Sequence, residues 1–231
     1  APYNNKCPEN IGLADGSICD GGCVALAMAQ IMKYHEYPQN GSNSWDYYTR
    51  SQNFHEQFNF ENLNIDWGNI IDLYDDESSD AQMDEVAKLI HACGVSVSMD
   101  YGDKDSKGNV TSSSGAYSFD VPHALIKYFN YNPNVTYKMR DYYSDDEWNA
   151  ILLNELRSGR PVYYSGSDFW SGGHAFIVDG YNGEGLYHIN WGWGWEFVYG
   201  MEHTLDGYYA LDALRPVETW GNSELSTRNY T

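Results

Sequence analysis

The sequence contains few basic residues and no long apolar run. Its 231 residues include 33 Asp and Glu but only 13 Lys and Arg, a formal net charge of −20. Such an acidic chain repels nucleic-acid phosphates and anionic lipid headgroups, so we expect no nucleic acid among its partners. No segment approaches the roughly 20 apolar residues that cross a bilayer, so we predict no membrane span. The negative charge favours solubility, as expected of an extracellular protein.

Cysteine is also scarce, with only Cys7, Cys19, Cys23 and Cys93. Four cysteines in a chain of this length do not make a disulfide-stapled miniprotein. Cys7 and Cys19 share a polar, loop-like segment and are candidates for a disulfide in an oxidising compartment. Cys93 lies in a helix-like stretch and is expected to be a buried thiol. The chain starts at Ala1 rather than Met, so we expect either a processed product or a chain trimmed at its N-terminus.

We predict neither a metal nor a cofactor. The segment 103–108 is similar to a calcium-binding loop, but Lys107 occupies a ligand position and the closing glutamate is missing. Cys7, Cys19 and Cys23 lack a fourth zinc ligand at a suitable spacing.

Helical patterns fill the first part of the chain, and strand-like patterns fill the last part. Apolar spacing, with Asp120 as a cap and Gly94 as a stop signal, predicts helices over 23–35, 80–93, 121–129 and 145–158. Alternation predicts strands over 95–99, 162–164, 175–178, 186–189 and 208–211. Helices over about 1–160 and an antiparallel sheet over about 161–231 predict an α+β fold.

Cys23 follows Gly21-Gly22 and opens the first predicted helix. A thiol at this position faces unpaired backbone N–H groups and the positive end of the helix dipole, which favour the thiolate and lower the cysteine pKa. The two glycines permit a sharp turn and the close approach of a substrate chain. The alternative is a small cysteine buried in the core.

His174 also follows two glycines, at the start of an apolar strand, and Asn182-Gly183 then signals a hairpin. A two-residue loop there would put His174 opposite Trp191. A loop one residue tighter, or centred on Asn182, would put it opposite Asn190. Either partner would fix the imidazole tautomer while the other ring nitrogen acts on a nucleophile. The other six histidines lack this setting.

Several motifs follow one another in a fixed order from residue 1 to about Pro216. They are Pro2-Tyr3-Asn4, Gly22-Cys23-Val24-Ala25, Met99-Asp100-Tyr101-Gly102, Pro161-Val162-Tyr163-Tyr164, Gly173-His174-Ala175-Phe176 and the run from Tyr187 to Gly194. In this order they resemble the streptopain-type cysteine peptidases, papain-fold enzymes that bacteria secrete as zymogens. The resemblance implies one mature peptidase domain over 1–231, with a helical subdomain packed against an antiparallel sheet subdomain and an active-site cleft between them.

The resemblance also implies roles for particular residues. Cys23 would be the nucleophile and His174 its general base and acid, supported by Asn190 and Trp191. The residues expected to contact substrate are Ser114, Gly115, Gly173 and Trp193. Substrates would be proteins or peptides with an apolar residue one position before the scissile residue. An N-terminal pro-segment would inhibit the zymogen, and the bacterial protein would be secreted or held at the cell surface.

Three features depart from the family's pattern. The oxyanion-hole glutamine of the family is expected upstream of Ala1. Trp195 stands where the family often has glycine, and about ten extra residues follow it before Leu205-Asp206-Gly207-Tyr208. No segment near the end of the sequence matches the usual last strand of the family.

Three functions remain open at this point. The leading interpretation is an endopeptidase that works through a thioester. Cys–His chemistry also serves small-amide hydrolases. An inactive surface-binding homologue is the third possibility, and the intact Cys23 and His174 count against it.

Overall fold

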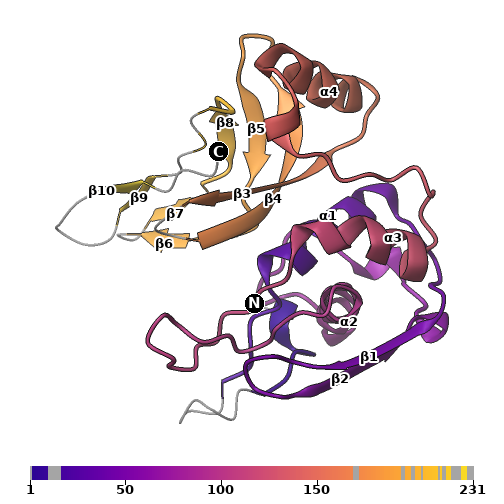
Figure 1. Ribbon diagram of the computed structural model, residues 1–231. Coiled ribbons are helices and arrows are strands. Elements are labelled where there is room, and N and C mark those ends of the chain that lie inside the picture. Colours follow the sequence, from indigo (N-terminus) through magenta and orange to yellow (C-terminus); the bar gives the residue numbers. More distant parts are fainter. Residues whose placement is uncertain are drawn as a thin grey trace. The chain divides into compact units, whose positions relative to one another are not determined.

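The computed structural model describes residues 2–9, 17–168, 172–193, 196–198, 201–203, 205–212, 214, 217–219 and 225–227. The chain divides into two compact units, the N-terminal unit Ala1–Tyr137 and the C-terminal unit Lys138–Thr231. Figure 1 shows the helices and strands of each unit. The boundary lies before the fourth predicted helix, so that helix belongs to the same unit as the sheet.

Helix α2 (Asp80–Ser96) is the centre of the N-terminal unit (Figure 1). It contacts α1 (Cys23–His35), α3 (Val121–Phe129) and a two-stranded antiparallel sheet of β1 (Ser44–Tyr48) and β2 (His55–Asn59). Short 3₁₀ helices occupy the connections: η1 (Pro2–Asn4), η2 (Phe60–Asn62), η3 (Trp67–Asn69) and η4 (Ser118–Asp120).

Helix α1 begins and ends where the sequence predicts. Val24, Ala27, Met28 and Met32 form its buried stripe, as expected for an amphipathic helix packed on a core. The helix ends because Glu36 adopts a left-handed conformation and returns its N–H to the carbonyls of Met32 and Lys33.

The predicted end of the second helix is wrong. Gly94 lies inside α2, which continues to Ser96, and the strand predicted over 95–99 does not form. A Cβ at Gly94 would overlap the buried Tyr101 hydroxyl, so this glycine serves close packing rather than termination. Val95, Val97 and Met99 are all buried, which explains an apolar alternation without a strand.

The two remaining predicted helices form, with one difference in capping. Helix α4 (Asp145–Arg157) has the expected capping box, in which Ser144 and Glu147 bond each other's backbone N–H groups. Helix α3 has proline in its first turn, but the Asp120 side chain makes no capping hydrogen bond. Asp120 is itself in helical conformation, and a capping side chain needs an extended backbone.

The C-terminal unit contains a four-stranded antiparallel sheet in the order β3-β4-β5-β8 (Figure 1). Its strands are β3 (Val162–Asp168), β4 (Gly172–Tyr181), β5 (Tyr187–Asn190) and β8 (Gly207–Tyr209). The 3₁₀ helix η5 (Arg140–Tyr142) precedes α4. Two further pairs of short strands form: β6 (Glu196–Val198) pairs with β7 (Met201–His203), and β9 (Val217–Thr219) pairs with β10 (Leu225–Thr227). The antiparallel sheet predicted for this part of the chain is therefore confirmed.

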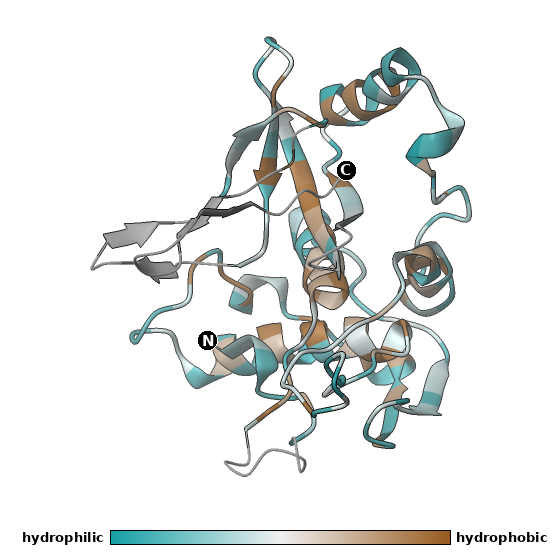
Figure 2. Cartoon of the chain, turned by 60° about the vertical axis from the view of Figure 1, so that its left-hand side comes forward, coloured by the Kyte–Doolittle hydropathy of each residue, from teal (hydrophilic) through white to brown (hydrophobic). Residues whose placement is uncertain are grey.

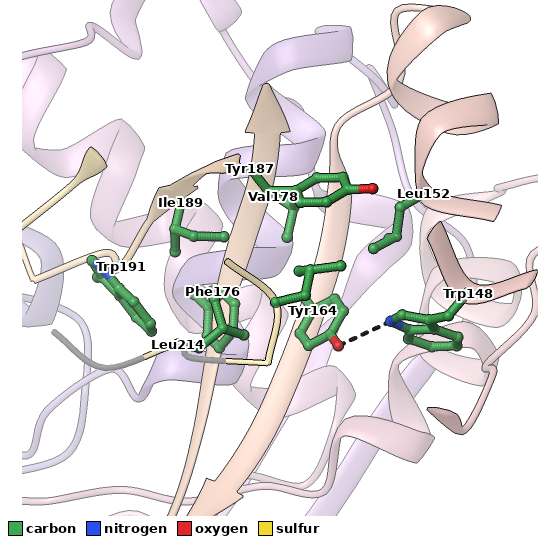
Figure 3. Packing of buried hydrophobic residues seen from close by; sticks show 10 residues of the cluster. Trp148, Leu152, Tyr164, Phe176, Val178, Tyr187, Ile189, Trp191 and Leu214 are labelled. Carbon is green, nitrogen blue, oxygen red and sulfur yellow. Dashed lines mark hydrogen bonds between the residues drawn. The ribbon is translucent and has the colours of Figure 1, made fainter. Parts of the chain in front are cut away.

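Aromatic side chains build the core of this unit between α4 and the sheet (Figure 3). Trp148 of α4 donates its Nε1–H to the Tyr164 hydroxyl at 3.1 Å. Phe176 stacks on Tyr164 and contacts Trp191, with ring centroids 5.4 Å and 4.7 Å apart. Figure 2 shows the apolar run of β4 as a brown band between polar ends. A buried phenylalanine such as Phe176 typically stabilises a fold by about 3–5 kcal/mol relative to alanine.

The predicted register of the hairpin is wrong. Five residues, 182–186, connect β4 to β5, because the Asn182 side chain accepts hydrogen bonds from the N–H groups of Glu184 and Leu186. Asn190 therefore pairs with Ile177, three residues beyond His174. A β-bulge between Val178 and Gly180 changes the register further along the ladder.

Among the residues that the structure describes, no helix is long and apolar enough to cross a membrane.

Candidate active site

Cys23 is the first residue of α1, and its side chain is partly exposed. The preceding Gly22 has a φ of 83°, a conformation that favours glycine. A Cβ at Gly22 would lie 2.8 Å from the sulfur of Met99 and 3.1 Å from the carbonyl oxygen of Ser114. Backbone conformation and crowding thus both require a glycine here. The thiol consequently lies at the positive end of a helix, where the thiolate is favoured.

Side chains from distant segments hold the backbone just before Cys23. Asn4 accepts the Gly21 N–H at 2.9 Å and donates to the Asp20 carboxylate at 3.1 Å. The other Asp20 oxygen accepts the Ser112 hydroxyl at 3.0 Å, and the Asp20 N–H donates to the Ser112 carbonyl at 2.8 Å. Asn4, Asp20 and Ser112, here called the Asp20 clamp, thereby join three chain segments at the approach to Cys23. The Asn4 amide is engaged at both of its ends.

The loop expected to contact substrate lies beside Gly22 in the same unit. Gly115 forms an antiparallel bridge with Asp100, donating its N–H to the Asp100 carbonyl at 3.3 Å and accepting the Asp100 N–H at 2.8 Å. In antiparallel pairing, the residues on either side of such a bridge present their main-chain groups to the opposite edge. The main-chain groups of Ser114 and Ala116 are therefore directed away from Asp100, whereas those of Gly115 are engaged with it.

His174 lies on β4 in the row of side chains that continues into the core of the C-terminal unit. Side chains alternate along a strand, so His174 shares a face with Phe176, and their rings stack at 6.0 Å. Its cross-strand neighbour on β3 is Gly166, which has no side chain. The imidazole therefore has room that a larger residue at position 166 would fill. The neighbouring Gly173 is exposed and pairs with Ser167.

The tautomer of His174 follows from its hydrogen bond. Its Nε2 lies 2.8 Å from the backbone carbonyl oxygen of Trp191. Because a carbonyl can only accept, Nε2 carries the proton, and Nδ1 is the basic nitrogen of the neutral ring. The indole rings of Trp193 and Trp191 stack on the imidazole at 4.9 Å and 6.2 Å.

Asn190 and Trp191 thus support His174, but not through the cross-strand pairing that the sequence predicts. The buried Trp191 supplies a main-chain oxygen and a ring. The Asn190 side chain accepts the Gly192 N–H at 3.0 Å, within the turn that follows β5. Asn190 therefore shapes the segment that carries the Trp191 carbonyl.

The model of the peptidase C10 family matches residues 1–209. The chain belongs to the peptidase C10 family. It is 39% identical over 201 residues to streptopain of Streptococcus pyogenes, covering 84% of this chain and 46% of streptopain. It is 32% identical over 216 residues to the thiol protease/hemagglutinin PrtT of Porphyromonas gingivalis, covering 93% of this chain and 23% of PrtT. The chain thus spans about half or less of the length of these curated relatives.

Two solved structures of similar proteins have the same fold. Interpain A cysteine protease of Prevotella intermedia superposes with a TM-score of 0.78 at 34% identity, over 93% of this chain and 82% of that one. A fragment of prointerpain A gives 0.74 at 34% identity, over 90% of this chain and 60% of that one. The resemblance inferred from the motifs and the papain-like α+β fold are both confirmed.

The other cysteines of this C10 chain lie in a different environment. Cys7 and Cys19 are separate buried thiols, so the predicted disulfide is not formed. Burial, reinforced by nearby negative charge, raises the pKa of Cys7 to about 12 and that of Cys19 to about 11. Burial likewise raises the pKa of Cys93, the buried thiol that the sequence predicts. These three thiols are therefore poor nucleophiles at neutral pH.

Several of the other histidines have carboxylate partners. His91 Nε2 lies 2.9 Å from Glu56, and His188 Nδ1 lies 2.6 Å from Asp179. Across the described residues, no group of three or more His, Cys, Asp or Glu side chains could hold a metal ion. Trp195, which departs from the family's pattern, lies outside the described residues.

Sequence reasoning missed two carboxylates next to the site. Asp20 anchors the approach to Cys23, and Asp206 accepts the Trp191 N–H at 2.8 Å. Asp206 belongs to a motif that the sequence does show, Leu205-Asp206-Gly207-Tyr208. An aspartate followed by glycine is common in turns, so the motif alone gives no reason to place it near a histidine.

Proposed function

We propose that this C10 chain is a cysteine endopeptidase in which Cys23 is the nucleophile and His174 the general base and acid. The observation that carries the proposal is the bond from His174 Nε2–H to the Trp191 carbonyl. It leaves Nδ1 as the nitrogen that exchanges a proton with a nucleophile. The helix-start position of Cys23 and the C10 relatives named as thiol or cysteine proteases support the same assignment.

The reaction proceeds in two steps through a thioester. The Cys23 thiolate attacks the scissile carbonyl carbon, and the Cys23 backbone N–H stabilises the oxyanion together with the glutamine expected upstream of Ala1. The imidazolium gives its Nδ1 proton to the leaving amine as the C–N bond breaks. His174 then takes a proton from water, which attacks the thioester and releases the carboxylic acid and the thiol. Trp193, stacked on the imidazole, favours its cationic form through its π face.

We propose that the substrate chain runs along Ser114, Gly115, Gly173 and Trp193. The geometry favours Ser114, with Ala116, as the main-chain partners of an extended peptide, because the N–H of Gly115 is already bonded to Asp100. The aromatic surroundings of His174 suit an apolar residue one position before the scissile residue. A peptide library that instead showed a charged preference at that position would contradict this specificity.

We propose further that the protein is bacterial, is secreted or held at the cell surface, and is made as a zymogen inhibited by an N-terminal pro-segment. The likeness to prointerpain A supports a pro-form. Expression together with the upstream coding region should yield a larger, inactive precursor. Appearance of activity before any cleavage would argue against inhibition by a pro-segment.

Casein zymography separates the candidate functions. Enzyme that includes the glutamine expected upstream of Ala1 should clear casein, and its Cys23→Ala and His174→Ala variants should not. A small-amide hydrolase would release ammonia from short amides but leave casein intact. An inactive homologue would do neither, and either of these results would reject the endopeptidase assignment.

A further inference from the structure

Two hydrogen bonds connect His174 to a carboxylate that lies outside the proposed catalytic set. His174 Nε2 donates to the carbonyl oxygen of Trp191 at 2.8 Å. The N–H of the same residue donates to Oδ1 of Asp206, also at 2.8 Å. Trp191 therefore holds the imidazole through its carbonyl and is itself held through its N–H.

Asp206 is well placed to fix this residue. Ile189 of β5 pairs with Gly207 of β8, and β5 ends at Asn190, so Trp191 has already left the ladder. Its N–H needs an acceptor other than a strand carbonyl, since an unpaired buried N–H is costly. The Asp206 carboxylate supplies one, and hydrogen bonds to a charged acceptor are stronger than neutral ones.

The segment that carries Asp206 is held in turn. The Tyr209 hydroxyl donates to the Leu205 carbonyl at 2.5 Å, and the Tyr209 ring meets the Trp191 ring edge-on at 5.4 Å. On the other side of Trp191, Asn190 accepts the Gly192 N–H. The Trp191 carbonyl thus lies in a turn that is restrained from both sides, by Asn190 and by Asp206.

We propose that Asp206 is a positioning residue for His174. By holding the Trp191 N–H, it orients the carbonyl that keeps the proton on Nε2, so that Nδ1 remains the nitrogen that serves Cys23. The inference rests on the proposed function only for its effect on turnover. The hydrogen bonds themselves belong to the C-terminal unit alone. Burial raises the pKa of Asp206, and the hydrogen bond from the Trp191 N–H opposes that rise.

The first experiment follows the His174 Nε2 proton by NMR, in a Cys23→Ala background that has no peptidase activity. The resonance is assigned by its loss in His174→Ala. In the parent chain this proton is hydrogen-bonded to a carbonyl, so it should exchange slowly with water. Asp206→Ala should speed the exchange at least about tenfold. Asp206→Asn retains an oxygen that can accept the Trp191 N–H, so it should restore slow exchange.

The second experiment measures kcat and KM in the Cys23 enzyme. A misplacement of about 1 Å in a catalytic group can cost about 100-fold in rate, so Asp206→Ala should lower kcat by roughly that factor. Its KM should change less than about threefold, because Asp206 does not touch substrate in this proposal. Asp206→Asn should retain kcat within about fivefold. Asp179→Asn is the matched control, since Asp179 bonds His188 in the same sheet and should leave both kcat and the His174 proton unchanged.

Each outcome decides the matter. Wild-type kcat and slow exchange in a folded Asp206→Ala chain would overturn the proposal. Equal losses of kcat in the alanine and asparagine variants, with an unchanged His174 proton, would overturn it as well. If Asp206→Ala does not fold, the exchange of the Trp191 amide in the parent chain decides, because rapid exchange there excludes the bond to Asp206. If the wild-type chain cleaves no peptide, the proposed function fails while the NMR result still tests Asp206.

Discussion

The two units of the chain present their candidate catalytic residues by different means. In the N-terminal unit, local chain geometry presents Cys23: a left-handed glycine, a helix start, and side chains that anchor the preceding backbone. In the C-terminal unit, the neighbouring strands and the turn after β5 hold His174 through a main-chain carbonyl and stacked rings. Cys23 thus depends on its local backbone and on anchoring side chains from distant segments, Asn4 and Ser112, whereas His174 depends on the register of a sheet. We therefore expect substitutions in the two units to change turnover and stability in different ways.

The largest expected effect is the loss of either reacting group. Cys23→Ala and His174→Ala should each lower turnover by at least about 10⁴-fold, because groups that act as a unit are not additive and each loss is nearly complete. Both variants should keep the thermal unfolding midpoint within a few degrees, since each side chain is only partly buried. Turnover of a peptide substrate and differential scanning calorimetry test this. Residual activity above about 1% in either variant would show that the pair is misassigned.

The second prediction concerns the reactivity of the four thiols. At pH 7, iodoacetamide should label Cys23 at least about 100-fold faster than Cys7, Cys19 or Cys93. The raised pKa values of about 12 for Cys7 and about 11 for Cys19 keep both thiols protonated until far above neutral pH, so their labelling should rise only in alkaline solution. Timed mass spectrometry of peptides from the folded protein measures the rates. Labelling of Cys93 ahead of Cys23 would reverse the assignment.

The third prediction concerns Gly22, and it separates the effect of backbone conformation from that of crowding by neighbouring atoms. Gly22→Ala should cost about 1–3 kcal/mol from its backbone conformation, and more because Met99 crowds the new Cβ. Gly108→Ala is the matched control, because Gly108 also has a positive φ but a Cβ added there would meet no atom within 4 Å. Urea unfolding of the two variants gives the difference due to crowding. Equal destabilisation would show that the contact with Met99 and Ser114 is unimportant.

The smallest expected effect is that of the Asp20 clamp. Asn4→Ala removes two side-chain hydrogen bonds and should reduce the free energy of unfolding by about 1–3 kcal/mol. It should also lower kcat by roughly tenfold, because the backbone before Cys23 loses an anchor. The exposed Asn5 provides a control of the same residue type one position away, and Asn5→Ala should change neither quantity. A full loss of turnover in Asn4→Ala, without destabilisation, would point instead to a direct role of this amide in oxyanion binding.

The sequence predicts best those features that depend on near neighbours. The limits of α1 follow from an apolar stripe, and the capping box of α4 follows from Ser144 and Glu147. Gly94 and the segment 95–99 were not predictable in this way, because a glycine that makes room for Tyr101 has the same sequence signal as one that ends a helix. The pairing of Cys7 with Cys19 failed for a related reason, since a shared loop does not fix the positions of two sulfur atoms.

The sequence by itself determined the family and the α+β fold, and it singled out Cys23 and His174 as the candidate catalytic pair, because these glycine-flanked residues and their ordered motifs are local signals. Only the tertiary structure decided how the histidine is held. A side chain of Asn182 lengthens the loop between β4 and β5, which moves Asn190 away from the position opposite His174. The Nε2–H of His174 then donates a hydrogen bond to a main-chain carbonyl, an acceptor that every residue possesses and that no sequence pattern singles out. Asp206, which accepts the N–H of Trp191, is likewise placed by strand register rather than by sequence distance.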